Sequence, residues 1–360
     1  MRVALDATPL IGIRTGIGTF VDEIVRGLNS SVIDEDPINV IEYTLSVGAR
    51  WRGETRGVWV PIPAGQAPTL WRRTKRPLIE KFTGNIDLVH GTNYLVPPSK
   101  APRLVTVHDL SFVHDPVAAP APVARFDRAV ADAVQSGATI HALSSYVAEE
   151  IAQRYGAEKI VVVCPGVHIK SVQISEKDNA KDFILALGAT VHRKRIPTLV
   201  QAFERVCEEL KEIELYIVGP PGDDEGAVKA AIKKLPLSAQ KRVLRIGRVD
   251  DLERDRLLAD ASLLAHPSEY EGFGLPVIEA MAARTPVITT TGGSLAEVAA
   301  DAAVLVEPGD IHELATGILH ILSSPETRKT LIEKGQIRAA EFSWESTTRG
   351  LINVYKDLAT

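Results

Sequence analysis

The chain has 360 residues, of which 45% are hydrophobic and 24% are charged, an ordinary composition for globular proteins. This length exceeds what one hydrophobic core usually serves and predicts two domains. The net charge of -5 argues against nucleic acid as a partner, because nucleic-acid-binding domains are strongly basic. No apolar run approaches the roughly 18 residues that a membrane span needs, and no signal-peptide pattern precedes the first strand-like run. We therefore expect a cytoplasmic protein.

The first half of the chain alternates short apolar runs with longer amphipathic stretches. Strands alternating with helices indicate a parallel sheet covered on both faces. The expected strands are 2–6, 40–47, 86–90, 103–108, 139–144 and 160–164, and the clearest expected helices are 17–28 and 125–137.

A polar, weakly periodic stretch at 166–182 predicts a linker. The alternation then resumes, so the chain is predicted to form two doubly wound α/β domains. Open α/β sheets bind ligands at the carboxyl ends of their strands, and two sheets facing each other across a cleft would form one shared site. The expected strands of the second half are 183–188, 213–219, 242–247, 262–267, 286–290 and 302–308.

Two turns that follow strands carry groups suited to an anion. In "GIRTGIGTF" (12–20), Gly16 lets the backbone approach a ligand at a helix N-terminus. The spacing is not that of a dinucleotide fingerprint, and a purely structural turn is the alternative. The second turn carries Arg193, Lys194 and Arg195, three cations that suit a diphosphate. Its alternative is a solvated basic turn.

The stretch "EYEGFGLPVIEAMA" (269–282) places the carboxylates of Glu271 and Glu279 around a glycine-rich turn. Pro276 suits the start of a helix. The positive helix end favours an acid in the first turn, which explains Glu279 but not Glu271. One carboxylate is suited to a diol such as ribose, and the other to a second hydroxyl-bearing group.

The stretch "EGFGLPVIEAMAARTPVI" resembles the signature of retaining glycosyltransferases of family 4, which have the two-domain GT-B fold. The E-x7-E motif of that family matches Glu271 and Glu279. The pattern is most similar to bacterial mannosyltransferase-like members. Further stretches fall in the family's order, namely "LVHGTNYLVPP" (88–98), "TVHDLSFVHDP" (106–116), "GATVHRKR" (188–195), "GGSLAEVAADAAVLVEPGD" (292–310) and "FSWESTTRGLINVY" (342–355).

The resemblance implies three parts of the chain. Residues 1–168 would form an acceptor-side Rossmann-like domain, and residues 169–341 a donor-binding Rossmann-like domain. Residues 342–360 would form a helix that crosses back to the first domain and contributes to a hinge.

The resemblance also implies residue roles. Glu279 would bind the donor's ribose, and Glu271 the sugar that is transferred. Arg193 and Lys194 would hold the diphosphate and stabilise it as it departs. The remaining roles are backbone contacts from Phe273, Gly274 and Leu275, a position near the phosphates for Gly16, and a position near the donor sugar for His108.

The implied reaction moves a hexose from a nucleotide sugar to a hydroxyl of a glycan or lipid-linked acceptor, with retention at the anomeric carbon. Mannose from GDP-mannose is favoured, and a glucose-type sugar from UDP or another nucleotide stays open. No cofactor and no metal are expected, and the acidic clusters at 34–37 and 222–226 are interpreted as surface loops. The alternatives are a GT-B nucleotide-sugar epimerase and a non-catalytic nucleotide-sugar-binding or scaffold protein.

Three positions depart from the family's pattern, namely Ala189, Arg195 and Arg284. Arg284 replaces the usual glycine after the motif helix, where a left-handed residue would cost about 1 kcal/mol. The segment "WRRTKRPLIEKF" (71–82) carries five cations with Trp71 and Phe82. A peripheral lipid contact at the inner face of the membrane is one interpretation. A solvated or acceptor-facing basic loop is the other.

Overall fold

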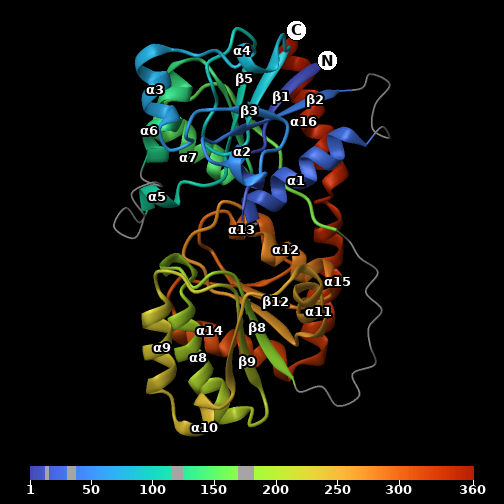
Figure 1. Ribbon diagram of the computed structural model, residues 1–360. Helices are drawn as coiled ribbons and strands as arrows, with labels where there is room; N and C mark the ends of the chain where they lie inside the picture. The colour runs from blue at the N-terminus through green and yellow to red at the C-terminus, as the bar shows by residue number, and fades with distance from the viewer. Residues whose placement is uncertain (13–15, 31–37, 115–124, 169–181) are drawn as a thin grey trace. The chain divides into compact units, whose positions relative to one another are not determined.

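The computed structural model describes residues 1–12, 16–30, 38–114, 125–168 and 182–360 (Figure 1). They form two compact units. The N-terminal unit comprises Met1–Gly166 and Trp344–Thr360, and the C-terminal unit comprises Val167–Ser343. Each unit holds one all-parallel sheet covered by helices, which confirms the predicted α/β fold class.

The N-terminal unit is built on a seven-stranded sheet with the order β3-β2-β1-β4-β5-β6-β7. Its strands are mostly buried and apolar, because helices cover both faces of a parallel sheet. From β1 the chain adds strands first on one side (β2, β3) and then on the other (β4 to β7). The loops after β1 and β4 therefore leave the carboxyl edge of the sheet in opposite directions. The strands are β1 (Arg2–Asp6), β2 (Asn39–Leu45), β3 (Val58–Val60), β4 (Leu88–Gly91), β5 (Arg103–Val107), β6 (Thr139–Ala142) and β7 (Ile160–Val162).

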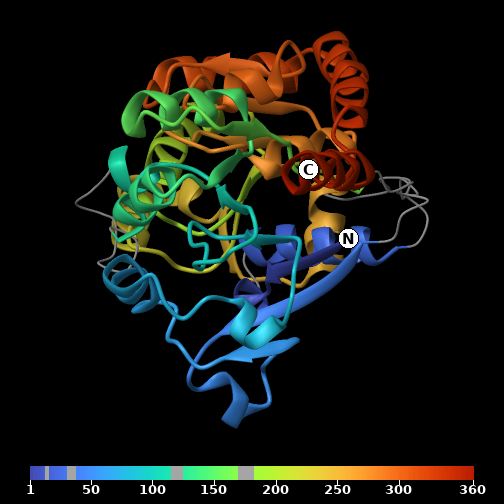
Figure 2. The ribbon, with the colours of Figure 1, turned by 90° about the horizontal axis from the view of Figure 1, so that it is seen from above.

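Two helices from opposite ends of the chain pack together in this unit, α1 (Gly16–Asn29) and α16 (Trp344–Ala359). A Cβ atom at Gly27 would lie 2.1 Å from Thr348 Oγ1, so only glycine permits this approach. Both views place the chain ends near each other (Figures 1 and 2). The other helices are η1 (Thr8–Leu10), α2 (Ala49–Arg52), α3 (Ala67–Thr74), α4 (Glu80–Thr83), α5 (Ser111–His114), α6 (Arg125–Gln135) and α7 (Ser145–Tyr155).

A buried chain of hydrogen bonds ties α16 to three strands. Because His141 Nε2 faces the carbonyl oxygen of Val163 at 2.9 Å, it must carry the hydrogen. Its Nδ1 then accepts from Thr106 Oγ1 at 2.9 Å, and Thr106 Oγ1 accepts from His90 Nε2 at 2.8 Å. His90 Nδ1 finally accepts from Tyr355 Oη at 2.7 Å. The whole chain is satisfied with both imidazoles neutral.

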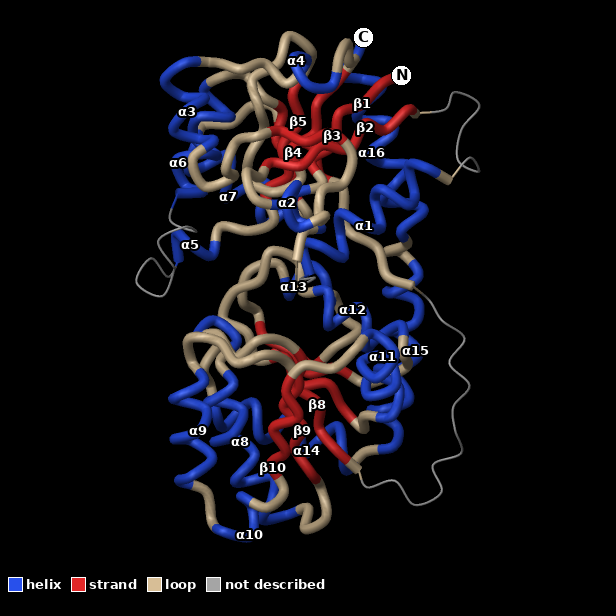
Figure 3. Tube along the Cα trace, viewed as in Figure 1, coloured by secondary structure: helices blue, strands red, loops and turns tan. Residues whose placement is uncertain are grey.

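The C-terminal unit has a six-stranded sheet with the order β10-β9-β8-β11-β12-β13. Its strands are β8 (Phe183–Leu187), β9 (Glu214–Val218), β10 (Val243–Gly247), β11 (Leu263–His266), β12 (Val287–Thr290) and β13 (Val304–Val306). Figure 3 shows α8 and α9 on one side of these strands and α11 and α12 on the other. The helices are η2 (His192–Lys194), α8 (Ile196–Glu209), α9 (Glu225–Lys234), α10 (Leu237–Gln240), α11 (Asp251–Asp260), α12 (Leu275–Ala282), α13 (Leu295–Ala299), α14 (Ile311–Ser323) and α15 (Pro325–Ala340).

The basic segment 71–82 lies in α3, α4 and the loop between them. The Trp71 side chain is only 7% exposed and belongs to the core, and Phe82 packs against the same core cluster. Neither ring is therefore available as the interfacial anchor that a lipid contact would use. Within the described ranges, no helix is long and apolar enough to cross a bilayer.

Candidate functional site

The strand order of the C-terminal unit marks a place for a ligand. Its order reverses between β8 and β11, which are neighbours in the sheet. Ligands of open α/β sheets bind at such a switch point, outside the carboxyl ends of the strands. The turn after β8 carries Arg193 and Lys194, and the loop after β11 carries Glu271. The topology thus brings together residues that are far apart in the sequence.

These three side chains form one ion-paired cluster. Arg193 Nη1 lies 2.7 Å from Glu271 Oε2, and Lys194 Nζ lies 2.5 Å from Glu271 Oε1. Lys194 is 9% exposed and Glu271 is 6% exposed. The Glu269 backbone N–H donates to the Arg193 carbonyl at 2.7 Å, which fastens the two loops to each other. The cluster carries one net positive charge, so it can receive an anion.

Burial and charge act against each other on Glu271. Burial alone would raise the pKa of its carboxyl group, but the charges of Arg193 and Lys194 hold that pKa well below its usual value. Glu271 is therefore ionised, and it holds both cations in place.

His266, the last residue of β11, lies beneath this cluster. Its Nε2 lies 3.3 Å from Glu271 Oε1, 3.4 Å from Lys194 Nζ and 3.2 Å from Ser268 Oγ. Burial lowers the pKa of His266 to about 4, and the Lys194 charge acts in the same direction. The imidazole is therefore neutral near pH 7. We did not expect this residue from the sequence, because it ends an apolar run that predicts a strand.

The Gly292–Ser294 turn clamps the backbone of Glu271. The Ser294 N–H and Oγ both donate to the Glu271 carbonyl at 3.0 Å. A Cβ atom at Gly293, where φ is +64°, would lie 2.4 Å from the same carbonyl oxygen. The glycine-rich stretch after β12 thus fixes the loop that presents the carboxylate.

The predicted backbone contacts stand at the start of α12. Gly274 has a φ of +90°, which glycine adopts without strain. Phe273 is 4% exposed and its ring packs on Phe342, so only its backbone is suited to meet a ligand. The first N–H groups of a helix have no partner within the helix. The N–H groups of Phe273, Gly274 and Leu275 are therefore suited to an anion.

Glu279 is not part of the ion-paired cluster. Its Oε1 lies 3.7 Å from Nη1 of Arg254, a residue of α11. Arg254 is half-buried and also lies near Asp251 and Asp255. It orients Glu279, and an arginine within an acid-rich helix does not stand out in the sequence.

The acidic cluster at 222–226 has structural partners. Asp223 accepts from the His192 backbone N–H at 3.0 Å. Glu225 Oε2 accepts from Thr190 Oγ1 and from Arg245 Nη2, both at 2.7 Å. Across the described residues, no group of three or more His, Cys, Asp or Glu side chains is arranged to hold a metal ion. The cluster at 34–37 lies outside the described residues.

The two remaining predicted residues belong to the N-terminal unit. His108 follows β5 and is 7% exposed, and burial lowers its pKa. Its Nε2 lies 2.8 Å from the Thr92 carbonyl oxygen and so carries the hydrogen, which leaves a lone pair on Nδ1. Gly16 begins α1, and a Cβ atom there would meet nothing within 4 Å. Packing among the described residues does not require this glycine.

Two family models match consecutive parts of the chain. The model described as "Glycosyltransferase Family 4" matches residues 14–171, and "Glycosyl transferases group 1" matches residues 168–338. The chain is 28% identical over 283 residues to O-antigen chain mannosyltransferase B of Escherichia coli, covering 75% of this chain and 74% of that protein. It is 34% identical to the MMP alpha-(1->4)-mannosyltransferase of Mycolicibacterium hassiacum, over 55% of this chain and about half (48%) of that protein.

Solved structures of low sequence identity share the fold. Sucrose-phosphate synthase from Thermosynechococcus elongatus is 20% identical, with a TM-score of 0.78 and 99% of each chain covered. Anabaena Alr3699/HepE, solved with UDP and glucose, is 18% identical, with a TM-score of 0.75 over 99% of this chain and 100% of that one.

Two parallel-sheet units with these neighbours define a protein of the GT-B fold. With both family models matched along its length, the chain is a glycosyltransferase of the family 4 type.

Proposed function

We propose that the enzyme transfers a hexose, with mannose from GDP-mannose favoured, to a hydroxyl of a glycan or glycolipid with retention at the anomeric carbon. The observation that carries this proposal is the Arg193–Lys194–Glu271 cluster at the switch point of the C-terminal sheet. It offers paired cations beside a carboxylate, which suits a diphosphate joined to a sugar.

Each charged group has a separate task in this proposal. Arg193 and Lys194 bind the diphosphate and stabilise the charge that develops on it as the glycosidic bond breaks. Glu271 holds the two cations and accepts hydrogen bonds from sugar hydroxyls. Glu279, held by Arg254, accepts hydrogen bonds from the ribose hydroxyls. The acceptor hydroxyl attacks the anomeric carbon on the same face from which the diphosphate departs. The departing phosphate accepts the proton of that hydroxyl.

His108 and Gly16 keep the roles that the resemblance implies, near the donor sugar and the phosphates. The lone pair on Nδ1 of His108 is suited to accept a hydrogen bond from a sugar hydroxyl. The donor is a substrate, so no resident cofactor is proposed.

The names of relatives support mannose. Two of them are mannosyltransferases, and a third, from Corynebacterium glutamicum, is called GDP-mannose-dependent. UDP-sugars remain candidate donors because solved structures with the same fold contain UDP or UDP-glucose.

The test is a donor panel of GDP-mannose, UDP-glucose and UDP-N-acetylglucosamine. Nucleoside diphosphate release is followed with and without a mannose-terminated acceptor, and the anomeric configuration of the product is read by NMR. We expect turnover with GDP-mannose and an α-linked product, with turnover lost in Lys194→Ala. Release from no donor would support the non-catalytic alternative, and isomerisation of the donor sugar without transfer would support the epimerase.

A further inference from the structure

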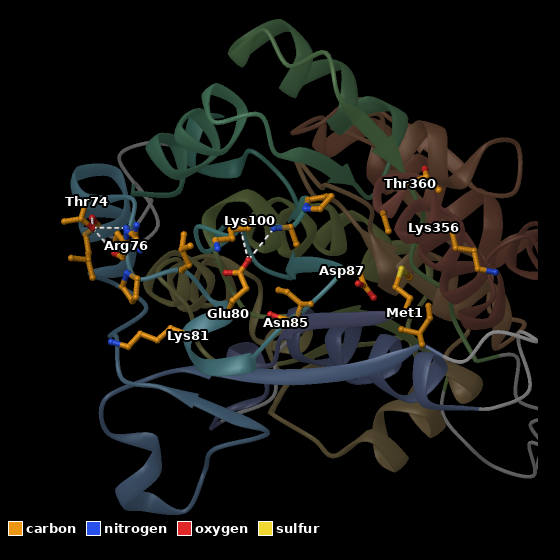
Figure 4. Close-up of a pocket in the computed structure, with 18 residues that line it drawn as sticks. Met1, Thr74, Arg76, Glu80, Lys81, Asn85, Asp87, Lys100, Lys356 and Thr360 are labelled. Carbon is orange, nitrogen blue, oxygen red and sulfur yellow. Dashed lines mark hydrogen bonds between the residues drawn. The ribbon is translucent and has the colours of Figure 1, made fainter.

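A hollow of about 1720 Å³ lies at the amino edge of the N-terminal sheet (Figure 4). Met1, Asp87 and Pro102 line it immediately before or at the start of β1, β4 and β5. His108 follows β5 at the opposite edge of the same sheet, about 20 Å away at roughly 3.3 Å per residue. The hollow is therefore separate from the place that His108 would take in the proposed transfer reaction.

Among the charged side chains described in the lining of this hollow, cations outnumber carboxylates. Arg76, Lys81 and Lys100 line it and are exposed. In the part of the chain that the structure describes, none of these three side chains forms a salt bridge. Lys356 of α16 adds a fourth cation from another wall. Figure 4 shows these side chains distributed along the hollow rather than gathered at one point.

Among the described lining residues the acidic side chains are Glu80 and Asp87, and both accept hydrogen bonds from the backbone of the walls. Glu80 Oε1 accepts from Ser99 Oγ at 2.7 Å and from the Lys100 N–H at 2.6 Å. Burial would raise the pKa of Glu80, but these hydrogen bonds lower it. Asp87 Oδ2 accepts from the Arg2 N–H at 2.7 Å. Both carboxylates are therefore held by the walls, and in the described part of the chain neither forms a salt bridge with Arg76, Lys81 or Lys100.

The rest of the lining restricts the class of ligand. Thr74 and Asn85 add neutral hydrogen-bonding groups, half of the described lining residues are apolar, and none of the described ones is aromatic. The hollow thus lacks the stacking surface that a nucleobase uses. Small-molecule sites usually measure about 300–1,000 Å³, so this space suits an extended chain. A lipid surface is disfavoured because the cations surround a concavity and Trp71 is buried.

We propose that this hollow binds an extended polyanion that carries phosphate groups along its length. Each phosphate would meet a separate cation, and the hydroxyl and amide of Thr74 and Asn85 would contact the links between them. Inorganic polyphosphate and a polymer of sugar phosphates share this chemistry.

Isothermal titration of the full chain with tripolyphosphate, at low and at raised salt, tests the proposal. The Arg193→Ala/Lys194→Ala background removes the phosphate-binding cations of the other unit, so the result does not depend on the donor site. The test variant is Arg76→Ser/Lys81→Ser/Lys100→Ser. The control is Arg73→Ser/Lys159→Ser/Lys241→Ser, which removes the same charge from exposed positions outside the hollow.

We expect the test variant to weaken tripolyphosphate binding about tenfold or more and the control to change it less than about twofold. Lys81→Ser alone should weaken it several-fold, and circular dichroism confirms that each variant is folded. A glycerol-phosphate oligomer that binds more tightly than tripolyphosphate assigns the site to sugar-phosphate-type polymers, and the reverse order assigns it to polyphosphate. Equal losses in both triple variants overturn the proposal. So does binding to phosphatidylglycerol vesicles without any binding to tripolyphosphate.

Discussion

Glu271 competes with any incoming anion for the same two cations. In the structure its carboxylate pairs with both Arg193 and Lys194. A diphosphate that binds there must share these cations with Glu271, which weakens ground-state binding. The same carboxylate keeps Lys194 ordered while it is almost buried, and ordered charges contribute most when charge develops in the transition state. Affinity and turnover should therefore respond to Glu271 in opposite directions.

Glu271→Gln tests this opposition. Loss of the negative charge should raise affinity for GDP several-fold, while turnover falls on the order of 100-fold because the cations and the sugar lose their partner. Calorimetry with GDP and steady-state kinetics measure the two effects. Glu269→Gln is the control, because Glu269 pairs with Arg195 at a more exposed position. If GDP affinity and turnover fall together, Glu271 does not restrain the cations.

His266 should act as a positioning residue. Replacement by leucine removes its contacts with Lys194, Glu271 and Ser268, and we expect kcat/KM for the donor to fall about tenfold. His266→Gln keeps a polar group there and should recover most of that loss. Because burial lowers the pKa of His266 to about 4, its titration should not appear in the pH profile between about 5.5 and 8. Equal losses in the two variants would contradict this role.

At this scale the sequence predicted part of the site. Arg193, Lys194 and Glu271 were expected to share a site because two of them follow one strand and the third belongs to the motif. His266 and Arg254 were not expected, since a histidine at the end of an apolar run and an arginine in an acid-rich helix look like ordinary strand and surface residues. Their importance follows from packing between segments, which a local pattern does not contain.

Among the elements, α12 is followed two residues later by a residue with a strained backbone. Arg284 has a φ of +65° and is exposed, which confirms the left-handed conformation expected from the glycine that the family carries there. Arg284→Gly should stabilise the protein by about 0.5–1 kcal/mol, because glycine adopts this conformation without a steric penalty. Arg284→Ala is the control and should change the unfolding free energy little. Thermal unfolding of the three proteins measures the difference, and no gain from glycine would contradict the assignment of strain.

The hydrogen-bonded chain from Tyr355 to Val163 makes the N-terminal unit sensitive to acid. Burial lowers the pKa of His141 to about 4, and it also lowers the pKa of His90 well below its usual value. The unfolded state then binds more protons between about pH 6.5 and pH 4. Stability that is present above pH 6.5 is lost as the pH falls, at about 1.4 kcal/mol per pH unit for each such group. Asp6, whose pKa burial raises to about 6, contributes in the opposite direction.

Tryptophan fluorescence isolates this effect, because all four tryptophans lie in the N-terminal unit. Guanidinium unfolding at pH 7 and pH 5 should show lower stability at pH 5. In His141→Asn the unfolding free energy at pH 7 should be lower. Its change with pH should correspond to about one fewer proton bound on unfolding than in the wild type. An unchanged pH dependence would show that His141 is not held neutral.

The elements themselves were largely predictable, and their ends less so. The expected helix 17–28 is observed as Gly16–Asn29, and the expected strand 40–47 as Asn39–Leu45. The short strand β3 was not expected, because only three apolar residues stand between Gly57 and Pro61, whereas the equally short β7 and β13 lie in longer apolar runs. Sequence also did not place Trp71 in the core, since the basic residues around it obscure the apolar face of α3.

For the whole molecule, the strand order of each sheet determines where chemistry is possible. The reversal between β8 and β11 brings Arg193 and Glu271 together at the carboxyl edge of the C-terminal sheet. The polypeptide enters the C-terminal unit once and returns to the N-terminal unit at Trp344. The hydrogen bond between Tyr355 and His90 fastens this last helix to the N-terminal sheet. The alternation of strand-like and helical stretches in the sequence predicted two doubly wound units. The identity of the donor and of the acceptor depends on individual side chains, which no general pattern specifies.

Calorimetric titration of GDP tests the central claim that the C-terminal unit binds a nucleoside diphosphate through these charges. We predict that the wild-type chain binds GDP, that Lys194→Ala loses about tenfold or more in affinity by removing a phosphate contact, and that Glu279→Ala loses a comparable amount by removing the ribose contact. Mannose 1-phosphate, which lacks ribose, should not distinguish Glu279→Ala from the wild type. Unchanged GDP affinity in both variants would contradict the claim.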